Sequence, residues 1–329
     1  MSERLHEYLS VSSEVTRALG LGQAVVALES TVISHGLPHP ANLDLARRVE
    51  AVVRAGGAVP ATVAVLDGRI RVGLDDEDLQ RLATEPGIRK LSRRDLPIAL
   101  AEGLAGATTV AATMIAADLA GIAVFATGGI GGVHRGAEAS FDISADLEEL
   151  ARTSVCVVSA GAKSILDLPK TLEVLETRGV SVLGWRTDRF PAFHSVDSGL
   201  AVDHRVEGAD QVARILRAKW HLGLDGGVLV ANPVPAPAAL DGAVVEQAVA
   251  QAMTDAAAQG VTGKALTPFL LSRLDVLTGG RSVAANVALL EANAAVAAEI
   301  AVAYARLEAQ RSLPRAAPNA KRGDRGRIA

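Results

Sequence analysis

The sequence has little cysteine, few aromatic residues and no excess of basic charge. It contains 329 residues with one cysteine, Cys156, and only 3% aromatic residues. One cysteine can form neither an intrachain disulfide nor a cysteine cluster for a metal, which fits a reducing cytoplasm. With few rings for base stacking and a formal net charge of −4, the chain lacks the features that hold nucleic acid or an anionic membrane. We therefore expect a cytoplasmic protein that does not act on either.

The chain also lacks an uninterrupted hydrophobic segment suited to a membrane. The start, MSERLHEYLS, is polar and charged, so we expect no signal peptide. The most apolar long stretch, 283–310, contains Glu291, Glu299 and Arg306, which favours an alanine-rich packed helix. Residues 311–329 carry six Lys/Arg against one Asp, together with prolines and glycines. We expect a single domain over 1–310 and a basic, disordered tail over 311–329.

Short apolar runs alternate with helical patterns along 1–310. Because these runs are apolar throughout, they are typical of strands covered by helices on both faces. The pair Asp67-Gly68 predicts a hairpin within 58–74 and hence a mixed sheet. The pattern predicts an α/β fold with strands within 23–31, 122–136, 155–161, 180–185 and 227–235, helices over 1–20, 41–57, 75–85, 106–121, 144–153, 168–179 and 210–223, and a helical last part.

Polar residues that follow apolar strands are the first candidates for a site, because ligands bind at the carboxyl ends of such strands. Glu29 directly follows Val25-Val26-Ala27-Leu28. Partial burial raises the pKa of a carboxyl group and makes it a candidate general acid. A carboxylate that caps a helix or pairs with an arginine is an equally good interpretation of this pattern.

Lys163, in SAGAKSILD (159–167), follows the strand predicted at 155–161 and has no acidic neighbour in sequence. Burial and a helix N-terminus close to Lys163 are both expected to lower its pKa. A neutral amine attacks sugar carbonyls. The alternative is a solvent-exposed lysine in a turn.

Two further stretches carry polar groups suited to an anion or a metal. TGGIGGVHRG contains Gly128, Gly129, Gly131 and Gly132, whose N–H groups can converge on an anion, with His134 and Arg135 as further donors. A flexible connector is the other interpretation. In FDISAD, Asp142, Ser144 and Asp146 can meet Mg²⁺ or Mn²⁺, although Ser144 and Asp146 also suit the start of a helix.

Basic and glycine-rich segments suggest further anion contacts. The segment KLSRRDLP brings together Lys90, Arg93 and Arg94, which could bind a phosphate. The other interpretation is that these basic side chains simply face solvent. Gly279-Gly280 precede a helix start and offer another anion pocket.

Taken together, these segments resemble the pseudouridine-5′-phosphate glycosidase family, also called indigoidine synthase A-like. The resemblance covers about residues 10–308. It is carried by ALESTVISHGLPHPANLDLA (27–46), PATVAVLDGRIRVGL (60–74), KLSRRDLP (90–97), GATTVAATM (106–114), FATGGIGGVHRGAEASFDISADL (125–147), SAGAKSILD (159–167), FPAFHSVDSG (190–199), ANPVP (231–235), TPFLL (267–271) and TGGRSVAANVALL (278–290).

The resemblance implies a three-layer α/β/α fold with a mixed, mostly buried central sheet, assembled as a homotrimer. It implies reversible cleavage of the C–C glycosidic bond of pseudouridine 5′-phosphate to uracil and ribose 5-phosphate. The cofactor implied is Mn²⁺, one per subunit, with Mg²⁺ or another divalent ion as alternatives. Enzymes of this kind are classed among the carbon–oxygen lyases.

The resemblance also assigns roles to residues. Lys163 matches the nucleophile that attacks ribose C1′, Glu29 the proton donor and Asp142 the metal ligand. The substrate-binding positions are Lys90, Val110, His134, Ser144, Ala145, Asp146 and Asn286.

Two other functions remain open from the residues alone. One is a Schiff-base lyase or aldolase on another phosphorylated sugar, because Lys163 and the anion loops would serve it equally well. The other is a non-catalytic nucleotide-binding protein on the same scaffold. The presence of Lys163, Glu29 and Asp142 together argues against a pure binding protein.

Overall fold

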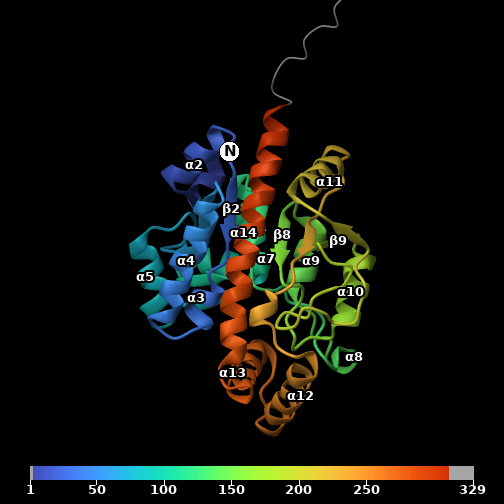
Figure 1. Cartoon of the computed structure of the whole chain (residues 1–329). Helices are drawn as coiled ribbons and strands as arrows, with labels where there is room; N and C mark the ends of the chain where they lie inside the picture. Colours follow the sequence, from blue (N-terminus) through green and yellow to red (C-terminus); the bar gives the residue numbers. More distant parts are fainter. Residues whose placement is uncertain (1–2, 311–329) are drawn as a thin grey trace, which may run out of the picture.

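The computed structural model describes residues 3–310 and is built around a mixed sheet of eleven strands (Figure 1). Five buried strands run parallel in its centre, so their carboxyl ends meet at one edge. The neighbouring order is β2-β7-β8-β11-β9. Their bounds are β2 Val25–Leu28, β7 Val124–Ala126, β8 Cys156–Ser159, β11 Val228–Ala231 and β9 Ser181–Trp185.

Strand β3 (Val59–Leu66) joins this parallel part to a smaller antiparallel part. Its second half pairs antiparallel with β4 (Arg69–Val72) and β6 (Gly106–Thr108). The turn to β4 has Asp67 at φ 52° and Gly68 at φ 71°, the left-handed pair expected in a two-residue hairpin. The hairpin and the mixed sheet predicted from Asp67-Gly68 are thus confirmed.

The sheet edges are formed by three-residue strands that the sequence pattern did not reveal. β1 (Leu9–Val11) pairs with β4, β5 (Arg89–Leu91) pairs with β6, and β10 (His204–Val206) pairs with β9. Two expectations are corrected here. Where one helix was predicted over 1–20, the described residues 3–20 form two helices separated by β1. The helix predicted over 106–121 begins only after β6. Runs this short show no periodicity, and sheet pairing overrides their local preference.

Helices cover both faces of the sheet, which confirms the three-layer α/β/α fold (Figure 1). On one face α14 (Arg281–Ala309) crosses β2, β7 and β8 between α4 (Ala41–Ala55) and α11 (Ala209–His221). The other face carries α7 (Val110–Ala120), α9 (Ala145–Arg152) and α10 (Leu168–Thr177). The remaining helices are α1 Glu3–Tyr8, α2 Ser13–Gly20, α3 Thr31–His35, α5 Asp76–Thr84, α6 Leu96–Ala101, α8 Ala137–Ser140, α12 Gly242–Ala258 and α13 Leu266–Thr278.

Helix α14 lies inside the protein rather than apart from it. Among the residues described, it is the one helix whose length and composition would suffice to cross a membrane. Of its most apolar window, however, 56% is buried against the sheet and the flanking helices. The expected alanine-rich packed helix over 283–310 is therefore confirmed.

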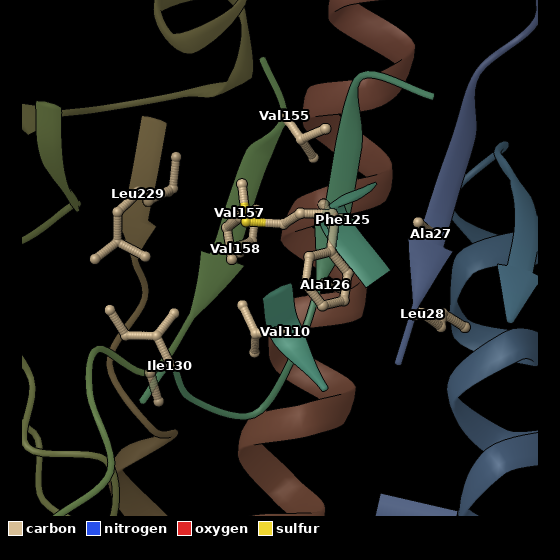
Figure 2. Close-up of a cluster of buried hydrophobic side chains, with 14 of the residues drawn as sticks. Ala27, Leu28, Val110, Phe125, Ala126, Ile130, Val155, Val157, Val158 and Leu229 are labelled. Atoms are coloured by element: carbon tan, nitrogen blue, oxygen red, sulfur yellow. The ribbon is translucent and has the colours of Figure 1, made fainter. Parts of the chain in front are cut away.

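The main core is built from small aliphatic side chains. Figure 2 shows its centre, where Val157 of β8 lies between Leu229 of β11 and Phe125 of β7. This cluster is continuous from Leu9 to Ala301. A smaller one, including Ile33, lies beneath α3, α4 and α5. The division into a domain over 1–310 and a tail stays a prediction, because 311–329 lie outside the described residues.

Side-chain caps fix the helices that begin at the carboxyl edge of the sheet. Thr109 caps α7, Ser144 caps α9, and Asp167 caps α10 by accepting the N–H of Lys170 at 3.1 Å. The cap at Ser144 confirms what the sequence predicted. Each such cap stabilises a helix by about 1 kcal/mol, and here each also fixes a loop that faces the same edge.

Candidate active site

The carboxyl ends of β2, β7 and β8 open into a cavity of about 740 Å³, bordered by α13 and the first turns of α14. That volume is typical of small-molecule sites. It is lined by all ten residues to which the family resemblance assigns a role: Glu29, Lys90, Val110, His134, Asp142, Ser144, Ala145, Asp146, Lys163 and Asn286. The structure thus brings them to one place, while their individual roles stay predictions.

Glu29 follows β2 and has the properties expected of an acid. Burial raises the pKa of its carboxyl group, and the negative charge of Asp146 adds to this. The charges of Lys163 and Lys90 and a hydrogen bond from Thr127 Oγ1 oppose the shift. No arginine among the described residues pairs with Glu29. The balance favours a carboxyl group that holds its proton closer to neutral pH than a free glutamate does.

Lys163 lies in the loop after β8, partly buried at the cavity wall. Its Nζ donates to the carbonyl of Gly129 at 2.6 Å, and its backbone N–H donates to Ile130 at 3.1 Å. The expectation of a solvent-exposed turn lysine is therefore wrong. The helix predicted over 168–179 is confirmed as α10, which begins at Leu168 with Asp167 as its cap.

The glycine-rich loop is packed tightly and is not a flexible connector. A Cβ on Gly131 would lie 2.2 Å from Ser144 Oγ, one on Gly132 2.4 Å from Thr171 Oγ1, and one on Gly129 2.5 Å from the ring of Phe193. These distances are too short for any side chain. Glycine is needed here for close approach to neighbouring groups, which also brings the loop backbone to the cavity wall.

Asp146 holds this loop against α7. One carboxylate oxygen accepts the N–H of Gly131 at 2.8 Å and the other accepts the N–H of Ala111 at 2.9 Å. The anion that the glycine loop binds is thus, in part, a carboxylate of the same chain. Ser144 Oγ accepts the N–H of Asp146 at 3.2 Å as the cap of α9. Both residues line the cavity while also supporting its wall.

His134 and Asp142 lie side by side on the rim of the cavity. The backbone N–H of His134 donates to the carbonyl of Asp142 at 3.0 Å. Burial lowers the pKa of His134, as do the charges of Lys163 and Lys90, while Asp142 opposes the shift. His134 is therefore neutral near pH 7 and can act as a ligand or a hydrogen-bonding group.

The donor set at this rim fits a weakly held divalent cation. The described residues contain no group of three His, Cys, Asp or Glu side chains that could bind a metal. Asp142, with His134 beside it, offers one carboxylate and one neutral imidazole. Mg²⁺ and ions like it are commonly held by one or two protein groups with water and substrate oxygens completing the shell. Asp142 and His134 fit that pattern.

The basic end of the cavity is formed by Lys90 and the start of α7. Lys90 is partly buried, and its charge acts on Glu29, His35 and His134. Val110 begins α7, whose N-terminus favours an anion. Of the other two basic residues in this run, Arg93 is bound by buried Glu149 at 2.6 and 2.9 Å, whereas Arg94 is exposed at the rim. The run is thus only partly available to a phosphate.

Two cavity histidines were missed by sequence reasoning. His194 is 2% exposed, its Nδ1 lies 3.1 Å from Ser164 Oγ, and burial lowers its pKa to about 4. Burial and the charge of Lys90 lower the pKa of His35, opposed by a backbone hydrogen bond with Arg89. Both lie within segments that carry the family resemblance, but no spacing or periodicity in the sequence marks them. The α13 residues Thr267, Ser272 and Asp275, which also line the cavity, had no such signal either.

Comparison with known proteins agrees with this geometry. Residues 14–303 match the family described as indigoidine synthase A like protein. The chain is 68% identical over 318 residues to the pseudouridine-5′-phosphate glycosidase of Rhodospirillum centenum, covering 97% of this chain and 99% of the relative. It is 56% identical over 303 residues to the enzyme of the same name from Caldanaerobacter subterraneus, covering 92% and 99%.

Two solved structures share the fold. The prealnumycin C-glycosynthase AlnA, solved with ribulose 5-phosphate, superposes with a TM-score of 0.86 at 42% identity over 92% of this chain and 99% of its own. An indigoidine synthase A-like protein from Thermotoga maritima gives 0.85 at 37% identity over 93% and 99%.

Proposed function

We propose that this chain, which belongs to the indigoidine synthase A-like family, is a pseudouridine-5′-phosphate glycosidase. The observation that carries the proposal is the meeting of Lys163 and Glu29 at one cavity, in a chain whose curated relatives bear that name over nearly their whole length. The substrates would be pseudouridine 5′-phosphate and water, and the products uracil and ribose 5-phosphate.

The cavity suits a nucleoside monophosphate in size and charge. Its volume of about 740 Å³ matches that of sites for ligands of this size. Lys90 and the N-terminus of α7 at Val110 would receive the 5′-phosphate, because both place positive charge or N–H donors there. Lys163 would then face the sugar, with the base towards the remaining cavity wall.

The first step would open the ribose ring. A C–C glycosidic bond has no leaving oxygen, so the paired-carboxylate design of ordinary glycosidases is insufficient. The lone pair of Lys163 Nζ attacks C1′, and the C1′–O4′ bond breaks. Glu29 gives its proton to O4′, which becomes the 4′-hydroxyl. The alkylated nitrogen then loses a proton, and that proton returns Glu29 to its acid form.

The second step would release the base. Glu29 delivers the proton to uracil C5, and the nitrogen lone pair forms a C1′=N iminium as the C1′–C5 bond breaks. Water then hydrolyses the iminium, giving ribose 5-phosphate, free Lys163 and a proton that returns Glu29 to its acid form. One water molecule is consumed overall. Because every step is reversible, uracil and ribose 5-phosphate would also condense on the same groups.

A divalent cation, Mn²⁺ by preference and Mg²⁺ or another as alternatives, would be held by Asp142 with His134 beside it. When bound, it would supply positive charge to the phosphate end of the substrate. One ion per subunit, a homotrimer and a cytoplasmic location are further predictions that rest on the family resemblance alone.

The alternative functions are weaker on different grounds. A pure binding protein has no need of a carboxyl group with a raised pKa near an amine, yet Glu29 and Lys163 provide that pair. A Schiff-base enzyme on another phosphorylated sugar uses the same groups, and AlnA is named as a C-glycosynthase. The identity of the base therefore separates the candidates.

The deciding experiment is release of uracil from pseudouridine 5′-phosphate by the purified protein with Mn²⁺. We expect uracil and ribose 5-phosphate in equal amounts, and condensation of the two when both are supplied. Lys163→Ala is the matched negative control. Absence of uracil release together with absence of condensation would overturn the proposal.

A further inference from the structure

Two buried asparagines form an amide pair behind the cavity. Asn293 lies on α14 and is fully buried, and Asn232 directly follows β11 and is 7% exposed. Asn232 Nδ2 donates to Asn293 Oδ1 at 2.9 Å, and the backbone N–H of Asn232 donates to Ser159 at 2.8 Å. Such a pair is costly to bury unless its groups are bonded, so the contacts of Asn293 are informative.

Asn293 donates its amide to the segment that follows β7. Its Nδ2 lies 2.8 Å from the carbonyl oxygen of Thr127 and 3.3 Å from that of Gly128. This segment touches both proposed catalytic groups. Thr127 Oγ1 donates to Glu29, and the carbonyl of Gly129, two residues further on, accepts from Lys163 Nζ at 2.6 Å. One side chain thus holds the backbone that contacts the acid and the amine.

Packing alone does not call for an asparagine at this position. Further along the same helix, the buried positions Ala297, Ile300 and Ala301 are apolar. A leucine has the same branching and the same number of side-chain heavy atoms as an asparagine, and its apolar surface suits such surroundings. The polar side chain is therefore best explained by its hydrogen bonds to the backbone at Thr127 and Gly128.

We propose that Asn293, held by Asn232, is a positioning residue that fixes the Thr127–Gly129 segment so that Glu29 and Lys163 stay in register with the substrate. The role rests on the proposed function for its catalytic consequence. Displacement of a reacting group by about 1 Å can cost about 100-fold in rate. The phosphate end of the cavity, at Lys90 and Val110, is not touched by Asn293.

The primary test is Asn293→Leu, assayed by uracil release. We expect kcat to fall by about 10- to 100-fold while KM changes by less than about threefold. Asn293→Leu alone leaves the buried amide of Asn232 unpaired, which lowers stability. The double variant Asn232→Leu with Asn293→Leu replaces both amides by apolar groups and so removes that cost. It should recover much of the Tm and none of the kcat. Ile300→Ala, on the same helix, is the control that lowers Tm and leaves kcat unchanged.

A titration separates positioning from general destabilisation and needs no substrate. The hydrogen bond from Thr127 favours the ionised form of Glu29, so its loosening should raise the pKa of Glu29 further. The other charged groups that act on Glu29, namely Lys163, Lys90 and Asp146, are unchanged in the variant. The carboxyl carbon of Glu29, assigned with Glu29→Gln and followed by ¹³C NMR, should titrate at higher pH in Asn293→Leu than in wild type.

The results divide cleanly. A wild-type protein that releases no uracil contradicts the proposed function, and the titration still decides the positioning role. Wild-type kcat in Asn293→Leu with an unchanged Glu29 titration would overturn the inference. The inference would also be overturned if Ile300→Ala lost as much kcat as Asn293→Leu at the same loss of Tm. Recovery of kcat together with Tm in the double variant would overturn it as well.

Discussion

The two ends of the central sheet carry hollows of similar size and different chemistry. At the carboxyl end the cavity measures about 740 Å³ and contains Glu29, Lys163, His134 and Asp142. At the amino end a hollow of about 590 Å³ lies between β2, β7 and the last turns of α14. Its lining is mainly small or apolar, with Tyr304, whose pKa is raised to about 12 chiefly by burial. Volume therefore does not distinguish a site from a gap in the packing.

Helix α14 borders both hollows and shows where they differ. At the carboxyl end its buried positions include Ser282 and Asn293, and Asn286 lines the cavity. At the amino end they are Ile300, Ala301 and Ala303. Groups that raise or lower one another's pKa cluster at functional sites. At the carboxyl end, the charges of Lys163 and Lys90 act on the pKa values of both Glu29 and His134.

The largest expected effect is at Lys163. Lys163→Ala should lower kcat for uracil release by at least about 1,000-fold, because the covalent step is lost. Lys163→Arg should fail equally, since a guanidinium does not act as the amine. Lys170→Ala, an exposed lysine on α10, is the matched control and should retain activity. Activity within tenfold of wild type in Lys163→Ala would place the chemistry elsewhere.

The next effect is at Glu29. Glu29→Gln keeps an acceptor for Thr127 but loses the proton, so kcat should fall by about 100- to 10,000-fold. Glu50 is a useful control because burial also raises its pKa and Thr62 donates to it at 2.5 Å, yet it lies outside the cavity. Equal losses of kcat in Glu29→Gln and Glu50→Gln would show that the effect comes from replacing any buried carboxyl group. That result would contradict a specific role for Glu29 in the cavity.

A smaller effect concerns stability at His194. Its pKa is about 4 in the folded protein against an ordinary value of 6.5, so the unfolded chain binds a proton that the folded chain does not. Above pH 6.5 His194 is neutral in both states, and the stability that its neutral form contributes is fully present. As pH falls from 6.5 towards 4, protonation of the unfolded chain lowers the free energy of unfolding by about 3 kcal/mol. Urea denaturation of His194→Gln should show a flatter dependence over this range. His204→Gln, at an exposed histidine, is the matched control variant. An unchanged slope in His194→Gln would contradict the assignment.

The smallest effect is expected at the amino-end hollow. Ala305→Leu adds apolar volume there, at a residue that borders the hollow. We expect kcat and KM for uracil release to stay within twofold of wild type, as the hollow has no catalytic role in this account. A large fall in kcat with unchanged Tm would mean that the two ends of α14 are coupled.

The fold class and the site location were predictable because each rests on strong local patterns. Apolar runs between helical segments predicted the covered sheet, and Asp67-Gly68 predicted its antiparallel part. Polar residues placed directly after apolar strands led to Glu29 and Lys163, since strand ends meet at one edge. The family resemblance added Val110 and Asn286, which no spacing singled out.

The remainder depended on contacts between distant segments. The three-residue strands β1, β5, β6 and β10 form only because a neighbour supplies hydrogen bonds. The pairing of Arg93 with buried Glu149 joins residues 56 positions apart, so the sequence alone could not show that Arg93 is occupied. Likewise, Asn293 acts on a backbone segment 166 positions away, and His194 becomes recognisable only once its burial is known.

The most direct test of the central claim is chemical trapping of the wild-type protein during turnover. Protein mixed with pseudouridine 5′-phosphate and borohydride should release uracil and carry a covalent adduct, mapped by peptide mass spectrometry. The account predicts that the adduct is on Lys163 and adds the mass of ribose 5-phosphate less one oxygen atom. Uracil release with Lys163 unmodified, or with the adduct on another lysine, would contradict it.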